Sequence, residues 1–190
     1  MKNAVIIHGK PGKEEYYQPA GDSESNSHWL PWLQKQLIIN SVLAETPEMP
    51  KPYEPSYESW LEVLQRYPLN EDTILVGHSC GGGFLIRWLS ENDVKVGKVI
   101  LVAPWINLEG KASGNGMFEG LQIDPGIEAK TTGVTVFASD NDYKPMHTSL
   151  AKLKQVISNL SVREFHNYGH FRLKDMQTRE FPELLEECLT

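Results

Sequence analysis

Short apolar runs recur along this chain, separated by stretches in which the apolar residues are spaced differently. Four runs are continuous and rich in β-branched residues, as in strands buried on both faces of a sheet. They are residues 4–7, 73–76, 99–102 and 134–138. Residues 42–44 give a weaker strand signal, and residues 162–165 alternate in polarity, which is typical of an edge strand.

The stretches between these runs carry apolar residues at helical spacing. They predict five helices, at residues 28–39, 56–64, 84–92, 146–157 and 180–188. Ser56 is suited to cap the second of these helices. Residues 9–27 are predicted to form a long polar loop, and four prolines exclude a helix from residues 42–55. Residues 107–132 are rich in glycine and predict a loop with room for one short helix.

Strands alternate with helices along the whole sequence. This order favours a mostly parallel sheet with helices on both faces. The chain has no internal repeat, low-complexity tract or break in composition, so residues 1–190 are expected to form one domain. A domain of 190 residues is long enough to bury roughly 70% of the surface that its unfolded chain exposes.

The second strong strand runs directly into the sequence Gly77-His78-Ser79-Cys80-Gly81, which matches the pattern G-x-S-x-G. After a buried strand and before a helix, this pattern predicts a sharp turn that exposes the serine hydroxyl at the carboxyl end of a sheet. Glycines on either side allow the close approach of chain segments that such a turn needs. The alternative is a glycine-rich turn in which the serine only caps a helix.

A serine nucleophile needs a base, and the base needs a group that orients it. In enzymes with this turn the order along the chain is serine, acid, histidine. Two histidines, His166 and His170, follow the last predicted strand, and His170 is favoured because it follows the loop glycine Gly169. Asp140 and Asp142 both follow the strand at 134–138, and Asp142 lies deeper in the loop.

An oxyanion site would be built from backbone N–H groups. One donor is expected from Cys80, the residue after the nucleophile, and the other from the loop after the first strand, near Gly9 and Lys10. Three aromatic residues are candidates to line a substrate pocket, although packing in the core explains them equally well. They are Trp105, Trp29 and Phe171.

In these motifs the chain resembles the retinoblastoma-binding-protein-9-like serine hydrolases, a compact branch of the α/β-hydrolase superfamily. The shared segments span nearly the whole chain; they are His8-Gly9, Trp29-x-x-Trp32-Leu33, Gly77 to Gly82, Val102 to Trp105, Ala138-Ser139-x-x-Asp142 and Gly169 to Phe171. The resemblance implies an α/β-hydrolase fold with a minimal cap. It also implies hydrolysis of small esters or amides by Ser79, Asp142 and His170. Here Tyr143 and Lys144 stand between the acid and a proline, which keeps Asp140 open as the alternative acid.

Composition narrows the function classes further. The formal net charge is −7, which disfavours nucleic acid and anionic membranes as partners. No segment is long and apolar enough for a membrane span or a signal peptide, and the two cysteines, Cys80 and Cys188, are expected to be free thiols in a cytoplasmic protein. The histidines and cysteines lack metal-site spacing, and no phosphate-binding glycine motif is present. We therefore expect no metal and no cofactor.

The leading hypothesis is a serine hydrolase that acts on a small-molecule acyl substrate through an acyl-enzyme. The alternative is a protein of the same fold with weak or no catalysis that acts in protein interaction, because fold alone does not fix function. Acyl transfer on the same residues is a third possibility. The sequence does not identify the acyl group, the leaving group or a protein partner.

Overall fold

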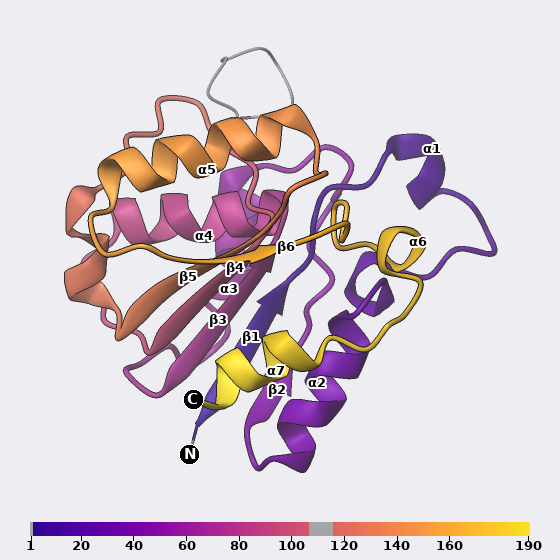
Figure 1. The fold of residues 1–190 in the computed structure, drawn as a ribbon, viewed down its shortest axis with the longest axis horizontal. Helices are drawn as coiled ribbons and strands as arrows, with labels where there is room; N and C mark the ends of the chain where they lie inside the picture. The colour runs from indigo at the N-terminus through magenta and orange to yellow at the C-terminus, as the bar shows by residue number, and fades with distance from the viewer. Residues whose placement is uncertain (1, 107–115) are drawn as a thin grey trace.

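The computed structural model describes residues 2–106 and 116–190, and its centre is a six-stranded parallel sheet (Figure 1). The strands lie in the order β2-β1-β3-β4-β5-β6. Their bounds are β1 (Asn3–Ile7), β2 (Leu43–Glu45), β3 (Thr73–His78), β4 (Lys98–Val102), β5 (Gly133–Ser139) and β6 (Ser161–Phe165). Every neighbouring pair is parallel, so the prediction of a mostly parallel sheet is confirmed.

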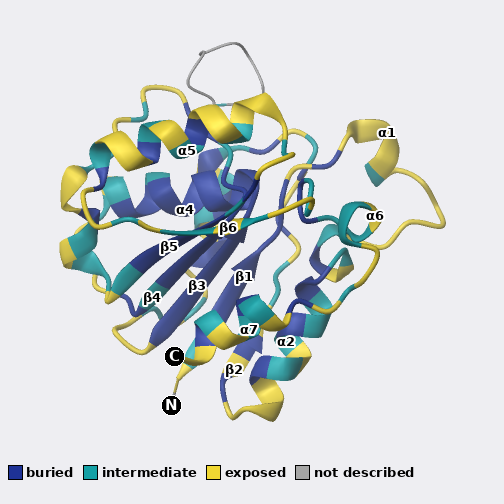
Figure 2. Cartoon of the chain, viewed as in Figure 1, coloured by how far each residue is buried: buried dark blue, intermediate teal, exposed yellow. Residues whose placement is uncertain are grey.

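Helices cover both faces of this sheet, as predicted (Figure 1). One face carries α3 (Tyr57–Leu64), α4 (Cys80–Glu91) and α5 (Lys144–Val156). The other carries α2 (Leu30–Ile39) and α7 (Pro182–Leu189). The parallel sheet thus lies in the middle layer, which is why its central strands are buried along their length (Figure 2).

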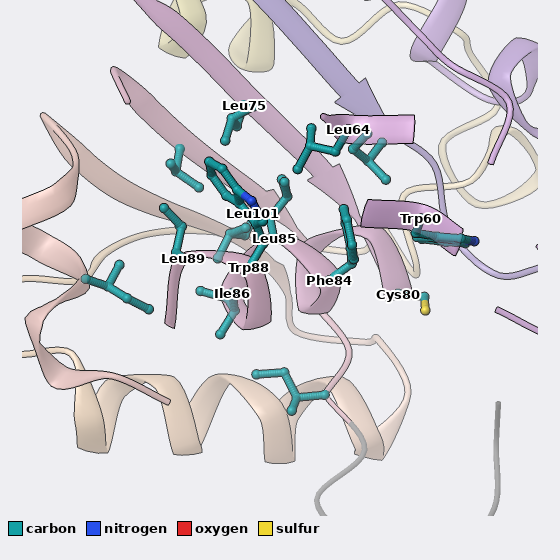
Figure 3. Packing of buried hydrophobic residues seen from close by; sticks show 14 of the residues in the cluster. Trp60, Leu64, Leu75, Cys80, Phe84, Leu85, Ile86, Trp88, Leu89 and Leu101 are labelled. Carbon is teal, nitrogen blue, oxygen red and sulfur yellow. The ribbon is translucent and has the colours of Figure 1, made fainter. Parts of the chain in front are cut away.

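The largest apolar cluster lies between the sheet and the helices α3 and α4. Phe84, Leu85 and Trp88 of α4 pack towards Leu75 and Leu101 of the sheet (Figure 3). These α4 residues recur at helical spacing, so they form one apolar stripe that holds the helix against β3 and β4. The same packing fixes the beginning of α4, where the serine motif lies.

The register of the strands brings distant segments together at the carboxyl edge of the sheet. Ile7 of β1 pairs with Gly77 of β3, so the segment after β1 lies beside the segment after β3. Ser139 of β5 pairs with Phe165 of β6, so the two loops that follow also begin side by side. These are the loops in which the sequence predicts the oxyanion donors, the acid and the base.

Several boundaries differ from the sequence predictions. The helix expected at 28–39 begins at Leu30, because His28 has a positive φ of 57°. The polar loop at 9–27 contains α1 (Lys13–Tyr16) and the 3₁₀ turn η1 (Glu24–Asn26), and α6 (Leu173–Met176) was not predicted. These elements are one turn long and bury almost no apolar residues, so they carry no hydrophobic pattern.

The other predictions hold with small shifts. Ser56 caps α3 by accepting a hydrogen bond from the N–H of Ser59, at 3.3 Å. The strand β6 is an edge strand, as its alternation predicts. Part of the loop expected at 107–132 lies outside the described residues, and the rest contains the 3₁₀ helix η2 (Pro125–Lys130). Among the helices that the structure describes, none is both long and apolar enough to cross a bilayer.

Gly81 offers a direct test of the packing at the start of α4. An added Cβ at Gly81 would lie 2.5 Å from the carbonyl oxygens of His8 and Ile7, which are backbone atoms. We expect Gly81→Ala to reduce the free energy of unfolding by about 2–3 kcal/mol, as overpacking does. Helix propensity alone would favour alanine by about 1 kcal/mol, so a loss reports the clash.

The matched control is Gly133→Ala, where an added Cβ meets nothing within 4 Å. It should change the free energy of unfolding by less than about 0.5 kcal/mol. Urea unfolding followed by circular dichroism measures both variants. Equal stabilities for the two variants would contradict the tight approach of α4 to the segment after β1.

Candidate active site

Ser79 lies at the turn between β3 and α4, in a backbone conformation that few residues adopt. Its φ is 53° and its ψ is −118°. The turn is held by backbone hydrogen bonds, since Ser79 donates to Val102 O at 2.9 Å and Trp105 N donates to Ser79 O at 2.9 Å. A side chain at Gly77 would meet Gly82 N at 2.7 Å, which explains why glycine is required there. Such strain costs on the order of 1–3 kcal/mol and is typical of functional sites.

The imidazole of His170 faces the Ser79 hydroxyl. His170 Nε2 and Ser79 Oγ are 3.0 Å apart. Both residues are buried, and each is 8% exposed. His170 lies in the loop between β6 and α6, directly after Gly169, whose φ is 54°. The left-handed glycine turns the chain back over the carboxyl edge of the sheet.

Asp142 lies on the other side of the same imidazole. Its carboxylate oxygens are 2.9 and 3.2 Å from His170 Nδ1, and its side chain is only 2% exposed. A carboxylate accepts only, so Nδ1 carries the proton and Nε2 is free to accept from the serine hydroxyl. The structure therefore brings Ser79, His170 and Asp142 into one hydrogen-bonded line.

Asp140, the alternative acid, does not contact His170. Its carboxylate contacts the imidazole of His166 and accepts from the N–H of Asn167 at 2.9 Å. This second pair is open to water, with the His166 side chain 81% exposed and the Asp140 side chain 49% exposed. Of the two acids that the sequence leaves open, only Asp142 is placed against the buried imidazole.

A set of hydrogen bonds fixes the loop that carries His170. Consecutive backbone N–H groups of this loop donate to side-chain oxygens from the end of β5 and the loop that follows it. The pairs are Asn167 with Asp140 at 2.9 Å, Tyr168 with Ser139 at 3.0 Å, and Gly169 with Asn141 at 2.8 Å. The segment from Ser139 to Asp142 and the loop that carries His170 are therefore joined by hydrogen bonds, and Asp140 is one of the acceptors.

Asp175 and His78 hold the His170 backbone itself. Asp175 of α6 accepts from the His170 N–H at 3.1 Å, and His78 Nε2 donates to the His170 carbonyl at 2.9 Å. Burial lowers the pKa of His78 well below its ordinary value, so this imidazole stays neutral. His78 is therefore a neutral hydrogen-bond donor that holds the loop of His170. The sequence gives no signal for Asp175, because α6 has no apolar periodicity.

Gly9 and Cys80, two of the expected oxyanion residues, lie against Ser79. Cys80 is the first residue of α4, and an added Cβ at Gly9 would come within 3.2 Å of Ser79 Cβ. His8 fixes this turn, because its Nδ1 donates to Gly9 O at 2.7 Å while its Nε2 accepts from Met49 N at 2.8 Å. Lys10, the third expected residue, lines the cleft beside them.

The cleft next to Ser79 and His170 has a volume of about 600 Å³. One wall comes from residues 10–27, and the opposite wall comes from residues 172–179, with α1 and α6 near each other at this end of the molecule (Figure 1). The loop at 10–27 therefore borders the site.

The three aromatic pocket candidates are not among the residues that line this cleft, and the alternative of packing in the core describes their contacts. Trp29 and Phe171 are fully buried in the core, where both pack against Phe181. Trp105 is partly buried and packs edge-on against Phe118, with ring centroids 5.5 Å apart. A large aromatic ring removes more apolar surface from water in the core than at the wall of a polar cleft, so core packing is favoured.

The pKa values of Glu24 and His28, which both line the cleft, are shifted by their surroundings. Burial, together with the nearby carboxylates of Glu15 and Glu48, raises the pKa of Glu24 to about 7. Burial, together with the nearby Arg172, lowers the pKa of His28 to about 4. The cleft therefore disfavours both an extra negative charge at Glu24 and a positive charge at His28.

Comparisons with known proteins agree with this arrangement. A family model described as serine hydrolase matches residues 18–186 of the chain. The protein YdeN of Bacillus subtilis (strain 168) is 29% identical over 180 residues, which cover 90% of this chain and 86% of YdeN. The crystal structure of the B. subtilis ydeN gene product has a TM-score of 0.81 at 28% identity, covering 100% of this chain and 97% of that one.

More distant structures share the fold. A YdeN-like protein from Pectobacterium atrosepticum has a TM-score of 0.69 at 16% identity, covering 99% of this chain and 90% of the other. Est1E from Butyrivibrio proteoclasticus has a TM-score of 0.64 at 17% identity, with 99% and 88% covered. Together with the six-stranded parallel sheet, these likenesses confirm the predicted α/β-hydrolase fold.

Cys80 follows Ser79 directly in the chain. The reactivity of its thiol shows whether the serine or the cysteine side chain faces the cleft. Both cysteines are free and buried, and burial raises the pKa of each thiol to about 12. We expect neither thiol to react with Ellman's reagent at pH 8 in the native protein, and both to react in guanidinium chloride. Rapid reaction of Cys80 in the native state would place its sulfur in the cleft and contradict the described turn.

The raised pKa of Glu24 predicts a pH dependence of stability. Between pH 4.5 and about 7 the folded protein holds a proton on Glu24 that the unfolded chain releases, so this residue lowers stability as the pH rises. The variant Glu24→Gln should therefore gain stability relative to the wild type between pH 5 and pH 8. With screening by water we expect a gain of about 1–2 kcal/mol. Urea unfolding at both pH values measures it, and a difference that does not change with pH would contradict the shift.

Proposed function

Because this chain belongs to the serine hydrolase family, we propose that it cleaves small esters or amides with Ser79 as nucleophile, His170 as general base and Asp142 as the orienting acid. The observation that carries the proposal is the line of contacts from Ser79 Oγ to His170 Nε2 at 3.0 Å and from His170 Nδ1 to Asp142 at 2.9 Å. Each atom of this line is a donor or an acceptor of the kind that the next atom needs.

The first half-reaction forms an acyl-enzyme. Ser79 Oγ attacks the carbonyl carbon of the substrate while His170 Nε2 takes the hydroxyl proton. The carbonyl oxygen becomes an oxyanion, which the N–H groups of Cys80 and of the Gly9–Lys10 segment would stabilise. The tetrahedral intermediate then expels the alcohol or amine, which takes the proton from His170, and the acyl group stays on Ser79.

The second half-reaction releases the acid. Water attacks the acyl carbon and gives its proton to His170 Nε2, and the intermediate returns the electron pair to Ser79 Oγ, which recovers the proton. Asp142 stays ionised throughout and stabilises the imidazolium that forms twice in each cycle. This chemistry uses only side chains and backbone of the chain, and we propose no metal and no cofactor.

The nature of the substrate rests on the chemistry of the site. A small acyl ester or amide is the substrate class that this line of residues serves. The likeness to the retinoblastoma-binding-protein-9-like hydrolases and a cytoplasmic location remain predictions from the sequence. The proposal concerns hydrolysis; acyl transfer would use the same acyl-enzyme with another acceptor in place of water.

A fluorophosphonate probe tests the nucleophile. We expect it to label wild-type protein at Ser79, as located by peptide mass spectrometry, and to leave Ser79→Ala unlabelled. Turnover of p-nitrophenyl acetate should fall in Ser79→Ala to the uncatalysed rate. Full labelling of Ser79→Ala, or a wild type that neither labels nor turns over this ester, would favour the alternative of a fold without catalysis.

The two aspartates give a matched pair that tests the acid. Asp142→Asn should lower kcat by about 10³–10⁴-fold, because an amide at this position favours the wrong tautomer of His170. Asp140→Asn keeps an acceptor for the Asn167 N–H and should lower kcat by less than about tenfold. Steady-state kinetics on both variants decides, and the reverse order of the two effects would assign the acid to Asp140.

A further inference from the structure

Most residues that line the cleft beside Ser79 carry polar or charged side chains, and polar atoms make up about half of the exposed lining surface. Among the lining residues that the structure describes, Pro11 and Leu173 are the only ones with apolar side chains, apart from two glycines. The rest of the lining consists of charged residues, amides, hydroxyls and imidazoles on both walls. Ligand pockets are more often lined by apolar and aromatic side chains, with only a few polar groups among them.

A charged bridge joins the two walls of the cleft. Arg179, from the segment after α6, reaches Asp22 at 2.5 Å and the Asn26 carbonyl at 2.9 Å. Both Arg179 and Asp22 line the cleft, so this ion pair is part of its charged surface. The bridge therefore adds charge at a place where an acyl pocket for fatty chains would be apolar.

The apolar residues that could have formed such a pocket are used elsewhere. Trp29 and Phe171 are fully buried in the core, and their sequence neighbours His28 and His170 line the cleft instead. On the opposite wall, Glu24 is half-buried and has the carboxylates of Glu15 and Glu48 for neighbours. A hydrogen-bond donor on the substrate would meet an acceptor there.

From this lining we propose that the cleft selects hydrophilic substrates, namely esters or amides whose acyl or alcohol part carries charged or hydroxyl groups. The inference rests on the proposed hydrolase function and narrows its substrate class. An aliphatic chain in the cleft would displace water from charged side chains without replacing their hydrogen bonds, and this desolvation opposes binding. A hydrophilic chain replaces at least some of them.

Matched esters test the selection. In one series the acyl chain of a p-nitrophenyl ester is hexanoate, 6-trimethylammoniohexanoate or the monoester of adipate. In a second series the alcohol of an acetate ester is hexanol or 1,6-hexanediol. We expect kcat/KM of a hydrophilic member to exceed that of its aliphatic partner at least tenfold in one series or the other, after subtraction of the rate with Ser79→Ala.

The variant Glu24→Leu replaces a polar lining residue with an apolar one. It should lower the ratio of kcat/KM for the hydrophilic ester to kcat/KM for its aliphatic partner at least threefold. Its matched control is Glu14→Leu, an exposed position of α1 that does not line the cleft, and it should keep the wild-type preference.

Turnover of p-nitrophenyl acetate, whose acyl group is too short to reach along the walls, separates the two claims. If acetate is hydrolysed but the aliphatic esters are as good as the hydrophilic ones in both series, the inference is overturned and the hydrolase function stands. If acetate is not hydrolysed and the fluorophosphonate probe does not label Ser79, the hydrolase function falls and the inference falls with it.

Discussion

The turn at Ser79 is the constraint on which the rest of the site depends. Ser79 has a positive φ at a sharp turn between β3 and α4. The turn is possible because the neighbouring glycines have no side chains, and an added Cβ at these positions would clash with backbone atoms. The apolar stripe of α4 holds that helix on the sheet and offsets the cost of the strained residue. The hydroxyl is thereby presented at the carboxyl edge of the sheet, where loops from three other strands converge.

The register of the sheet brings the other residues of the site to the turn at Ser79. Because β5 and β6 pair in parallel, the loops that follow them begin together, and three backbone N–H groups of one loop bind side chains of the other. His170 is held at three points. Asp142 contacts its imidazole Nδ1, Asp175 accepts from its backbone N–H, and His78 donates to its backbone carbonyl. An imidazole held in this way would lose little conformational freedom on accepting the Ser79 proton, as the proposed mechanism requires.

The sequence was sufficient where hydrophobic pattern or local motif carries the information. The buried strands, the turn at Ser79 and the choice of His170 over His166 follow from short apolar runs and from glycine placement. Tertiary context decides the rest: Asp140 and Asp142 have the same chemistry two positions apart, and only the path of the loop after β5 separates them. The polar walls of the cleft come from one-turn elements with no apolar period, and Trp29 and Phe171 look the same in sequence whether they line a pocket or a core.

A crystal structure of the protein after reaction with a phosphonate inhibitor would show which residue is the nucleophile. We expect a covalent bond from phosphorus to Ser79 Oγ, with His170 Nε2 within hydrogen-bond distance of the adduct. We also expect one phosphonyl oxygen to accept from the backbone N–H of Cys80 and from the segment at Gly9 and Lys10. An adduct on another residue, or an imidazole of His170 turned away from Ser79, would contradict this expectation.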